Sequence, residues 1–571
     1  MTPSKPKFSR KALNILIFLT AGLILVFSQL GKDTKSPVAT DSQPAPVDQP
    51  RQSSSPAESA KTQSKGVAKG DSDRNDGDAA KADPISQAMA KQAATGDQAD
   101  AKAQSKADRV SGILRAEQFF PELADIPEIP EVDFELKPKR FVHSSGMEVL
   151  YVQSPSLPMV DVRLVFDAGS ARDPKGLAGL ASTTSQLLAL GTKELDASGV
   201  AKTFESLGAQ FDTGSYRDMG IASLRVLSDE QYLQPAIQNF IQVTSQIEFR
   251  NDDFNREKSR RLIGIAQLEQ NPGALVDRAA FTALYGEAHP YGRPSIGTQE
   301  SVESFTPQMV KDFHGKFYVA KNATLAIVGD IDESQVKAIA NDIAAELPGG
   351  KQAVALPALE KSQTAAPVYV EFPSKQTHLM MIGPAISRGN SDYYALYLAN
   401  HILGGAGFAS MLNKEIRQKQ AFAYSVGSSL VPMAATGPVV INMQTRADQA
   451  RAAIVATEQV IAKLIENGPS ETELENAKRQ ILSEFALRAA NNSSQLGHIA
   501  SIGFYDLPLD YLASFNEKIS EVSAEQVQAM VKKYFENLLV VSAGSADPHA
   551  GDAAQTKDES KPAEKAAEVA R

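Results

Sequence analysis

The sequence GLASTTSQLLALGT, residues 179–192, begins with glycine, continues with a mainly apolar stretch and ends in a Gly-Thr turn. Its pattern predicts a helix over 177–190. Further helices are predicted at 197–207, after the candidate cap Asp196, and at 229–247, 252–270 and 306–318. Alternating apolar residues predict strands at 149–152, 160–166 and 221–227, and a final strand is predicted at 323–328.

The second half of the chain repeats this plan. TPQMVKDFHGKFY (306–318) followed by NATLAIVGD matches SAEQVQAMVKKYF (523–535) followed by NLLVVSAGS. Each pair predicts an amphipathic helix that leads into a short buried strand. We therefore expect an internal duplication, divided at the Pro- and Gly-bearing stretch 348–367, with one α/β unit at 137–347 and another at 367–545.

Composition excludes several classes of function. The chain of 571 residues has a formal net charge of −10, and its folded part has no cluster of Lys and Arg, so a nucleic-acid partner is not expected. It contains no cysteine, which rules out disulfides, cysteine nucleophiles and thiolate metal sites. A metal site would have to use His, Asp or Glu.

The N-terminal residues predict a membrane anchor. Lys5, Lys7, Arg10 and Lys11 precede an almost uninterrupted apolar run over 12–30, which as a helix would be roughly 28 Å long and could cross a bilayer once. Residues 1–31 are therefore expected to form a cytoplasmic basic end and a transmembrane helix, with a cleaved signal peptide as the alternative. Everything downstream would be extracytoplasmic, on the periplasmic side of a bacterial inner membrane.

Two segments are expected to be disordered. Residues 32–110 are rich in Ala, Gln, Ser, Asp, Lys and Pro and have almost no large apolar side chains, and residues 547–571 are similarly polar. Such segments cannot bury enough apolar surface to fold. The first is expected to act as a tether between the membrane helix and the folded part.

The stretch 179–192 resembles the hallmark segment of the insulinase/pitrilysin zinc metallopeptidases, in which a helix presents G-L-A-H-x-x-E-H before a Gly-Thr turn. Further similarity lies in ESLGAQFDTGSYRD (205–218), EAHPYGRPSIGT (287–298) and ANHILGGAGFASMLNKEIRQKQAFAYSVGSS (399–429). The resemblance covers nearly all of 137–545. It implies an α/β (α+β) fold of two tandem homologous insulinase-like domains, each a mostly antiparallel sheet packed with helices.

The resemblance also shows that the zinc site is degenerate. In H-x-x-E-H the two histidines bind zinc and the glutamate activates the metal-bound water. Ser182, Ser185 and Gln186 stand at these positions, and the distal glutamate ligand falls near 262–264, where the sequence is Leu-Ile-Gly. We therefore expect no metal or other cofactor on this chain.

Histidines elsewhere do not supply a substitute site. The seven are His143, His289, His314, His378, His401, His498 and His549, and no two lie within five positions of each other. His289, in the HPYGRP turn, and His401, on an apolar helix, are expected to have structural roles.

A second motif of the family is retained. Its C-terminal domain contributes an Arg and a Tyr seven residues apart, and Arg417 and Tyr424 have this spacing. The resemblance implies that Tyr424 donates its hydroxyl to the oxyanion and that Arg417 holds a substrate carbonyl or the tyrosine. The loop that contains Gly404, Gly405 and Gly407 resembles, in its position, the glycine-rich substrate loop in the inactive subunit of mitochondrial processing peptidase.

These features together predict the non-catalytic subunit of a heterodimeric peptidase. Arg417 and Tyr424 would act in trans on a peptide or unfolded protein, beside a partner of the same family that carries the zinc. Alternatives remain open at this point: Arg417 as a helix-end charge, Tyr424 as a packing residue, and the glycines as a helix cap. The whole chain could also be a structural or binding protein, like the family-related core subunits of respiratory complexes, or an independent hydrolase with new ligands.

Overall fold

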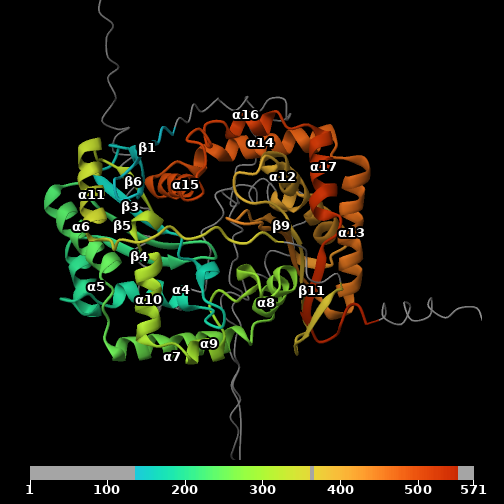
Figure 1. The fold of residues 1–571 in the computed structure, drawn as a ribbon. Coiled ribbons are helices and arrows are strands. Elements are labelled where there is room, and N and C mark those ends of the chain that lie inside the picture. Colours follow the sequence, from blue (N-terminus) through green and yellow to red (C-terminus); the bar gives the residue numbers. More distant parts are fainter. Residues whose placement is uncertain (1–135, 360–365, 551–571) are drawn as a thin grey trace, which may run out of the picture.

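The structure is a computed structural model, and it describes residues 136–359 and 366–550. Within these ranges it contains two β-sheets, each packed with helices (Figure 1). The expected membrane segment 12–30, the linker 32–110 and residues 551–571 of the tail lie outside the described residues. Among the described helices, none combines the length and the apolar character needed to cross a membrane.

The first sheet has six strands in the order β1-β2-β6-β3-β5-β4. Neighbouring strands are antiparallel except β2 and β6, which run parallel. The strands are β1 Lys139–Val142, β2 Glu148–Gln153, β3 Met159–Phe166, β4 Gln210–Ser215, β5 Gly220–Leu227 and β6 Ala323–Gly329. The strands expected at 149–152, 160–166, 221–227 and 323–328 are thus confirmed as β2, β3, β5 and β6.

The second sheet repeats this arrangement with five strands in the order β7-β11-β8-β10-β9. Only β7 and β11 are parallel. The strands are β7 Val368–Glu371, β8 Gln376–Pro384, β9 Ala423–Leu430, β10 Pro438–Arg446 and β11 Leu539–Gly544. Both sheets are therefore mostly antiparallel, as the resemblance implied.

Helices alternate with these strands. In the first half they are α4 Leu180–Leu187, α5 Ala197–Ser206, α6 Glu230–Ser245, α7 Asn251–Leu268, α8 Pro272–Tyr285, α9 Gln299–Glu303, α10 Pro307–Phe317 and α11 Glu333–Glu346. In the second half they are α12 Tyr393–Asn400, α13 Ala450–Asn467, α14 Glu471–Arg488, α15 Asn492–Phe504, α16 Phe515–Ser520 and α17 Ala524–Phe535. The five predicted helices correspond to α4, α5, α6, α7 and α10.

The repeated helix–strand unit is confirmed in detail. Helix α10 begins at the cap Thr306, whose side chain accepts a hydrogen bond from Met309 N, and α17 begins at the cap Ser523. Each helix leads into a strand, β6 or β11, in which every residue is buried. The short polar caps start both helices in the same way, because their side chains satisfy backbone N–H groups that have no intrahelical partner.

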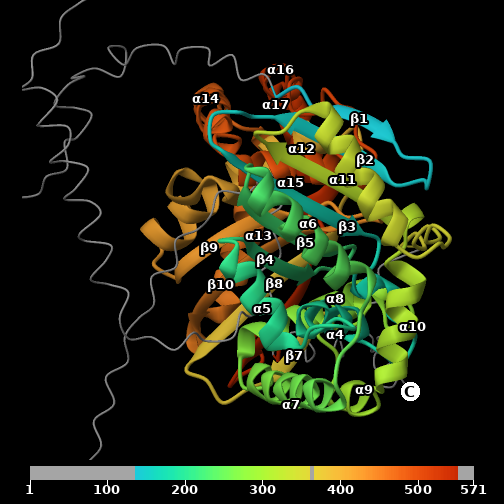
Figure 2. The ribbon, with the colours of Figure 1, turned by 90° about the vertical axis from the view of Figure 1, so that its left-hand side faces the viewer.

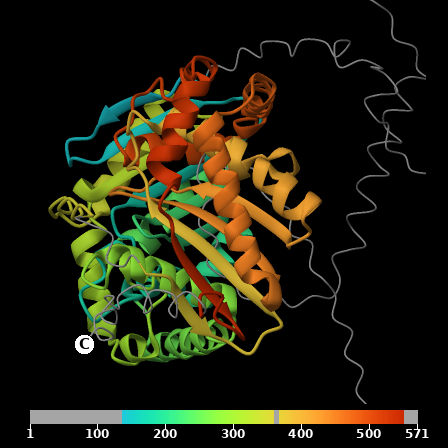
Figure 3. The ribbon, with the colours of Figure 1, turned by 90° about the vertical axis from the view of Figure 1, so that its right-hand side faces the viewer.

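Each sheet is covered on one side by helices of its own half. Figure 2 shows α6 and α11 in front of the strands of the first sheet, and Figure 3 shows α13 and α17 in front of those of the second. Apolar residues of these helices and of the inner strand faces form two large clusters. Burial of this apolar surface is the main favourable contribution to the fold.

The other side of each sheet is covered by a helix from the opposite half. Helix α8, from the first half, packs with Val276 and Phe281 on the second sheet, whereas α15, from the second half, packs on the first sheet (Figure 1). Gly503 allows this approach, since a Cβ there would lie 2.4 Å from a Leu150 methyl carbon. The two halves of the sequence therefore exchange helices and share their hydrophobic cores.

A buried carboxylate also joins the halves. Asp218, in the turn between β4 and β5, accepts hydrogen bonds from Tyr291 Oη at 2.5 Å, Tyr505 Oη at 3.0 Å and Ala434 N at 2.8 Å. Burial raises the pKa of the Asp218 carboxyl, and these three donors act in the opposite direction. One side chain thus connects the first sheet, the 287–298 segment and two loops of the second half.

Replacing Asp218 by Ala is expected to lower the free energy of unfolding by about 3 kcal/mol, because the buried Tyr291 hydroxyl and the donors of Tyr505 and Ala434, in partly buried hydrogen bonds, lose their acceptor. Urea denaturation followed by circular dichroism measures this loss. Asp312→Ala, an exposed carboxylate on α10, is the matched control and should change stability by less than about 0.5 kcal/mol. Equal stability of the two variants would contradict this function of Asp218.

Candidate functional site: a guanidinium at the former zinc position

The N-terminus of helix α4 has a tightly constrained backbone position. Its cap Gly179 has φ 90°, and a Cβ there would lie 2.5 Å from Ile296 O, so glycine is required on both grounds. The buried carboxylate of Asp173 accepts hydrogen bonds from Gly179 N and Ala181 N, each at 2.7 Å. Burial raises the pKa of Asp173 to about 7, although these two bonds and the nearby arginines oppose the shift.

The three degenerate zinc-motif residues lie on this helix. Ser185 is buried and adjacent to Tyr318, Ser182 is half-buried, and Gln186 is exposed. Ser182 and Gln186 are four positions apart, so their side chains project from the same face, as the two histidines of H-x-x-E-H would. The helix therefore keeps the geometry of the motif with different chemical groups.

Arg261 of α7 binds both of these side chains. Its Nη1 donates to Ser182 Oγ at 2.8 Å, and its Nη2 donates to Gln186 Oε1 at 2.7 Å. Nη1 also lies 3.3 Å from Ile296 O, and only 8% of the residue is exposed. The guanidinium thus occupies the place between the two positions at which zinc ligands would stand.

A carboxylate accompanies this buried cation. Glu257 lies one turn earlier on α7, is buried, and accepts a hydrogen bond from Arg260 Nη1 at 3.2 Å. Burial raises the pKa of Glu257, while the charges of Arg260, Arg261 and Arg256 lower it. The expected distal-ligand positions carry no acidic group: Ile263 is exposed, and a Cβ at Gly264 would meet open space.

These residues do not fit a zinc ion. A hydroxyl and a carboxamide are weak zinc ligands, and the oxygens of Ser182 and Gln186 already accept hydrogen bonds from Arg261. A guanidinium in the same place would also repel a divalent cation. In the ranges 136–359 and 366–550, no group of three or more His, Cys, Asp or Glu side chains could hold a metal ion.

Neither of the two singled-out histidines contributes to this cluster. His289 Nε2 contacts Pro357 O at 3.0 Å, and its Nδ1 accepts from Tyr291 N, so the ring attaches the connecting segment near 357 to the 287–298 loop. His401 is buried in the π-helical turn η7, His401–Gly405. Their surroundings agree with the structural roles that the sequence indicated.

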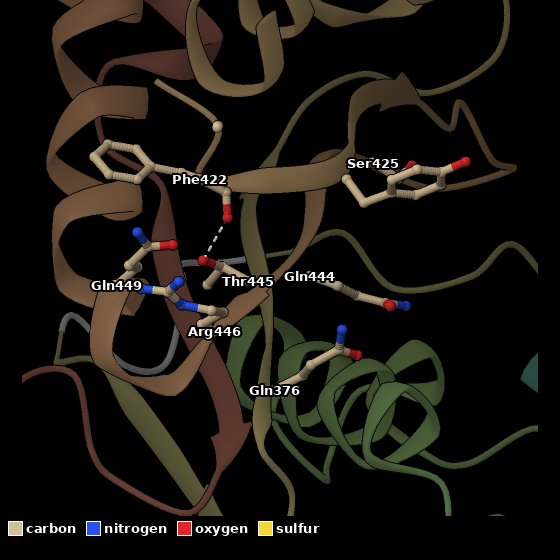
Figure 4. Close-up of a pocket in the computed structure, with 9 residues that line it drawn as sticks. Gln376, Phe422, Ser425, Gln444, Thr445, Arg446 and Gln449 are labelled. Atoms are coloured by element: carbon tan, nitrogen blue, oxygen red, sulfur yellow. Dashed lines mark hydrogen bonds between the residues drawn. The ribbon is translucent and has the colours of Figure 1, made fainter. Parts of the chain in front are cut away.

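The retained Arg and Tyr form a separate, exposed cluster in the second half. Arg417 lies on the π-helical segment η9 (Asn413–Lys419), and its guanidinium carbon is 4.9 Å from the ring centre of Tyr424 and 4.5 Å from that of Phe408. Tyr424, near the start of β9, is 85% exposed. Tyr424 also lines a pocket of about 320 Å³ at the ends of β8, β9 and β10 (Figure 4).

The three glycines have different structural roles. A Cβ at Gly404 would lie 2.5 Å from Ser428 N, so this buried glycine is needed for contact with β9 of the same chain. Gly405 lies against Asn400, and only Gly407 has a positive φ, 56°. Gly404 and Gly405 therefore serve local packing, whereas Gly407 allows the turn that leads into Phe408.

Two residues of these clusters, Arg261 and Phe408, were not predicted from the sequence. Arg261 lies 75 residues after Gln186 and directly before the positions where the distal glutamate was sought. A cationic residue beside a missing acidic ligand was the available signal. Phe408 carried no comparable signal, because its exposure and its contact with Arg417 depend on the fold.

Replacing Arg261 by Met keeps an unbranched side chain but removes the guanidinium, its hydrogen bonds to Ser182 and Gln186, and a positive charge near the buried Glu257. The free energy of unfolding is expected to fall by about 2 kcal/mol in urea denaturation. Arg250→Met removes an exposed arginine just before α7 that pairs only with the partly exposed Asp196, and it should cost less than about 1 kcal/mol. Arg261→Met with wild-type stability would show that the bridge between α4 and α7 is dispensable.

Comparisons with known proteins agree with these observations. Residues 148–299 match the family described as "Insulinase (Peptidase family M16)", and residues 304–481 match "Peptidase M16 inactive domain". The solved peptidase M16 inactive domain from Pseudomonas fluorescens is 37% identical with a TM-score of 0.69, over 72% of this chain and 98% of that one.

Curated relatives give the same result at lower identity. A protein described as "Non-peptidase homolog YmxG" from Helicobacter pylori is 25% identical over 402 residues, 69% of this chain and 90% of that protein. An "Uncharacterized zinc protease" from Rickettsia bellii is 25% identical over 397 residues, 68% and 93% of the two chains. The chain belongs to the insulinase family, peptidase family M16, as an inactive homologue in which Ser182, Ser185 and Gln186 stand at the zinc-motif positions.

Proposed function

We propose that this chain is the non-catalytic, membrane-anchored subunit of a heterodimeric insulinase-family zinc peptidase. The observation that carries the proposal is the contrast between the two clusters. Arg261 fills the former metal position, whereas Arg417 and Tyr424 are held together at the surface with Tyr424 85% exposed. An exposed tyrosine held beside an arginine is well suited to contact a second molecule.

The chemistry of this cluster supports a contribution in trans. When water attacks a peptide carbonyl, negative charge develops on the oxygen, and a hydroxyl donor such as Tyr424 stabilises it. The Arg417 guanidinium lies 4.9 Å from the centre of the Tyr424 ring, so the two side chains could contact the same substrate group. The zinc and the base would belong to the partner, a family member that retains H-x-x-E-H, and this chain would supply the Arg and the Tyr.

Sheet edges offer a binding mode for the substrate. Strand β4 is at the edge of the first sheet, and β9 is at the edge of the second. An extended peptide or unfolded segment can add to such an edge through backbone hydrogen bonds, which do not depend on its sequence. The proposed substrate is therefore a peptide or unfolded protein.

The proposed compartment rests on the N-terminal sequence. The basic residues before the apolar run 12–30 favour a cytoplasmic N-terminus and an extracytoplasmic folded part on the periplasmic side. The polar segment 32–110 is long enough to let that part meet a partner away from the membrane surface. A structural or binding role without catalysis is the rival hypothesis, and a co-expression experiment separates the two.

The chain is to be co-expressed with a zinc-bearing family member from the same genome, and peptidase activity of the purified complex measured. Tyr424→Phe is expected to lower kcat about a hundredfold, since loss of one oxyanion donor typically has this effect, and Arg417→Ala should act in the same direction. Co-purification should be unchanged.

Two substitutions of the same kind away from this cluster serve as controls: Tyr232→Phe on α6 and Arg250→Ala before α7 should leave kcat as it is. Wild-type rates for Tyr424→Phe and Arg417→Ala in a complex that still forms would support a structural role. Failure of the two chains to co-purify would refute the heterodimer.

A further inference from the structure

The large apolar side chains exposed at the surface include two aromatic ones among the described residues, and both contact the same arginine. Phe408 is 66% exposed and Tyr424 is 85% exposed, and the Arg417 guanidinium lies against both rings, at 4.5 and 4.9 Å. The other residues of this exposed set are aliphatic. Aromatic residues and arginine are the types that most often dominate binding energy at protein surfaces.

The backbone holds Phe408 in this position. Its carbonyl oxygen accepts a hydrogen bond from Gln418 Nε2 at 3.1 Å, and the preceding Gly407 carbonyl accepts from Ser410 Oγ at 2.7 Å. Gly407 has a positive φ, and a Cβ there would meet nothing within 4 Å, so it is the backbone conformation of this turn, not a lack of space, that favours glycine before Phe408. The loop is thus attached to η9, and the cost of ordering Phe408 on binding is reduced.

A polar pocket adjoins the Tyr424 ring. Its polar lining includes Ser425, the carboxamides of Gln376, Gln444 and Gln449, and Arg446, whose guanidinium is paired with Asp448 (Figure 4). Carboxamides both donate and accept hydrogen bonds, which matches the amide groups of a peptide better than the ester and hydrocarbon groups of a lipid. The Arg417 guanidinium lies beside both rings, and its N–H groups are donors from which a peptide carbonyl could accept.

We infer that Phe408, Arg417 and Tyr424 form one recognition surface for an apolar side chain of an extended peptide, with Phe408 as the residue that sets this preference. The apolar side chain packs on the Phe408 and Tyr424 rings, its carbonyl accepts from Arg417, and a neighbouring polar residue enters the carboxamide-lined pocket. The inference rests on the proposed function for its substrate class, but binding is testable on this chain alone.

The probes are two fluorescein-labelled peptides of Ser, Gly and Gln that differ at one central residue, Leu in one and Asp in the other. Fluorescence anisotropy with the full chain measures the two dissociation constants. The Leu peptide should bind at least about tenfold more tightly. Phe408→Ser should remove this preference, whereas Phe408→Leu should retain most of it.

Val142→Ser, a change of another exposed apolar residue on β1, is the matched control and should leave both constants unchanged. In the complex with the zinc-bearing partner, Phe408→Ser should raise KM for a Leu-containing substrate without lowering kcat, whereas Tyr424→Phe acts on kcat. This split separates recognition from the proposed catalytic contribution.

Four outcomes would overturn the inference: no binding of the Leu peptide, equal binding of both peptides, loss of partner co-purification in Phe408→Ser, or a Phe408-dependent interaction only with anionic lipid vesicles. The proposed function can fail independently. If Phe408-dependent peptide binding persists while Arg417→Ala and Tyr424→Phe leave the complex fully active, recognition stands and catalysis in trans does not.

Discussion

The hydrogen bonds from Arg261 to Ser182 and Gln186 hold helix α4 against α7 at the positions of the family's zinc motif. In a zinc-bearing family member a metal connects the motif helix to the later helix; here a guanidinium makes the same connection between α4 and α7. Because this cation is a side chain of α7, α4 is held against α7 without a bound metal. Ser182, Ser185 and Gln186, at the motif positions, supply neither the zinc ligands nor the carboxylate base on which hydrolysis by this chain alone would depend.

The remainder of the molecule keeps the two halves in a fixed relation. Helices α8 and α15 each pack on the sheet of the opposite half, and Asp218 accepts hydrogen bonds from segments of both. Because the cores are shared, neither half can move without exposing apolar surface. The exposed cluster of Phe408, Arg417 and Tyr424 therefore stands on a rigid support, which suits a surface that must meet a second molecule in one geometry.

Much of the fold could be predicted from the sequence, because apolar periodicity and capping residues are local signals. The duplicated unit, found as α10–β6 and α17–β11, is an example, and so is the degenerate motif at Ser182, Ser185 and Gln186. The exchange of α8 and α15 could not be predicted, since nothing local says which sheet an amphipathic helix will cover. The contacts of Arg261 and Phe408 could not be predicted either, because they join segments that only the tertiary fold brings together. The seven-residue spacing of Arg417 and Tyr424, in contrast, can be seen in the sequence itself.

The zinc content of the full chain, purified alone and dialysed against zinc, tests the central claim most directly. Elemental analysis by mass spectrometry should find far less than stoichiometric zinc, while a family member that retains H-x-x-E-H, treated in parallel, should be fully loaded. Stoichiometric zinc that is lost on changing Ser182, Gln186 or Glu257 would contradict the account, because it would place a metal where the structure places the guanidinium of Arg261.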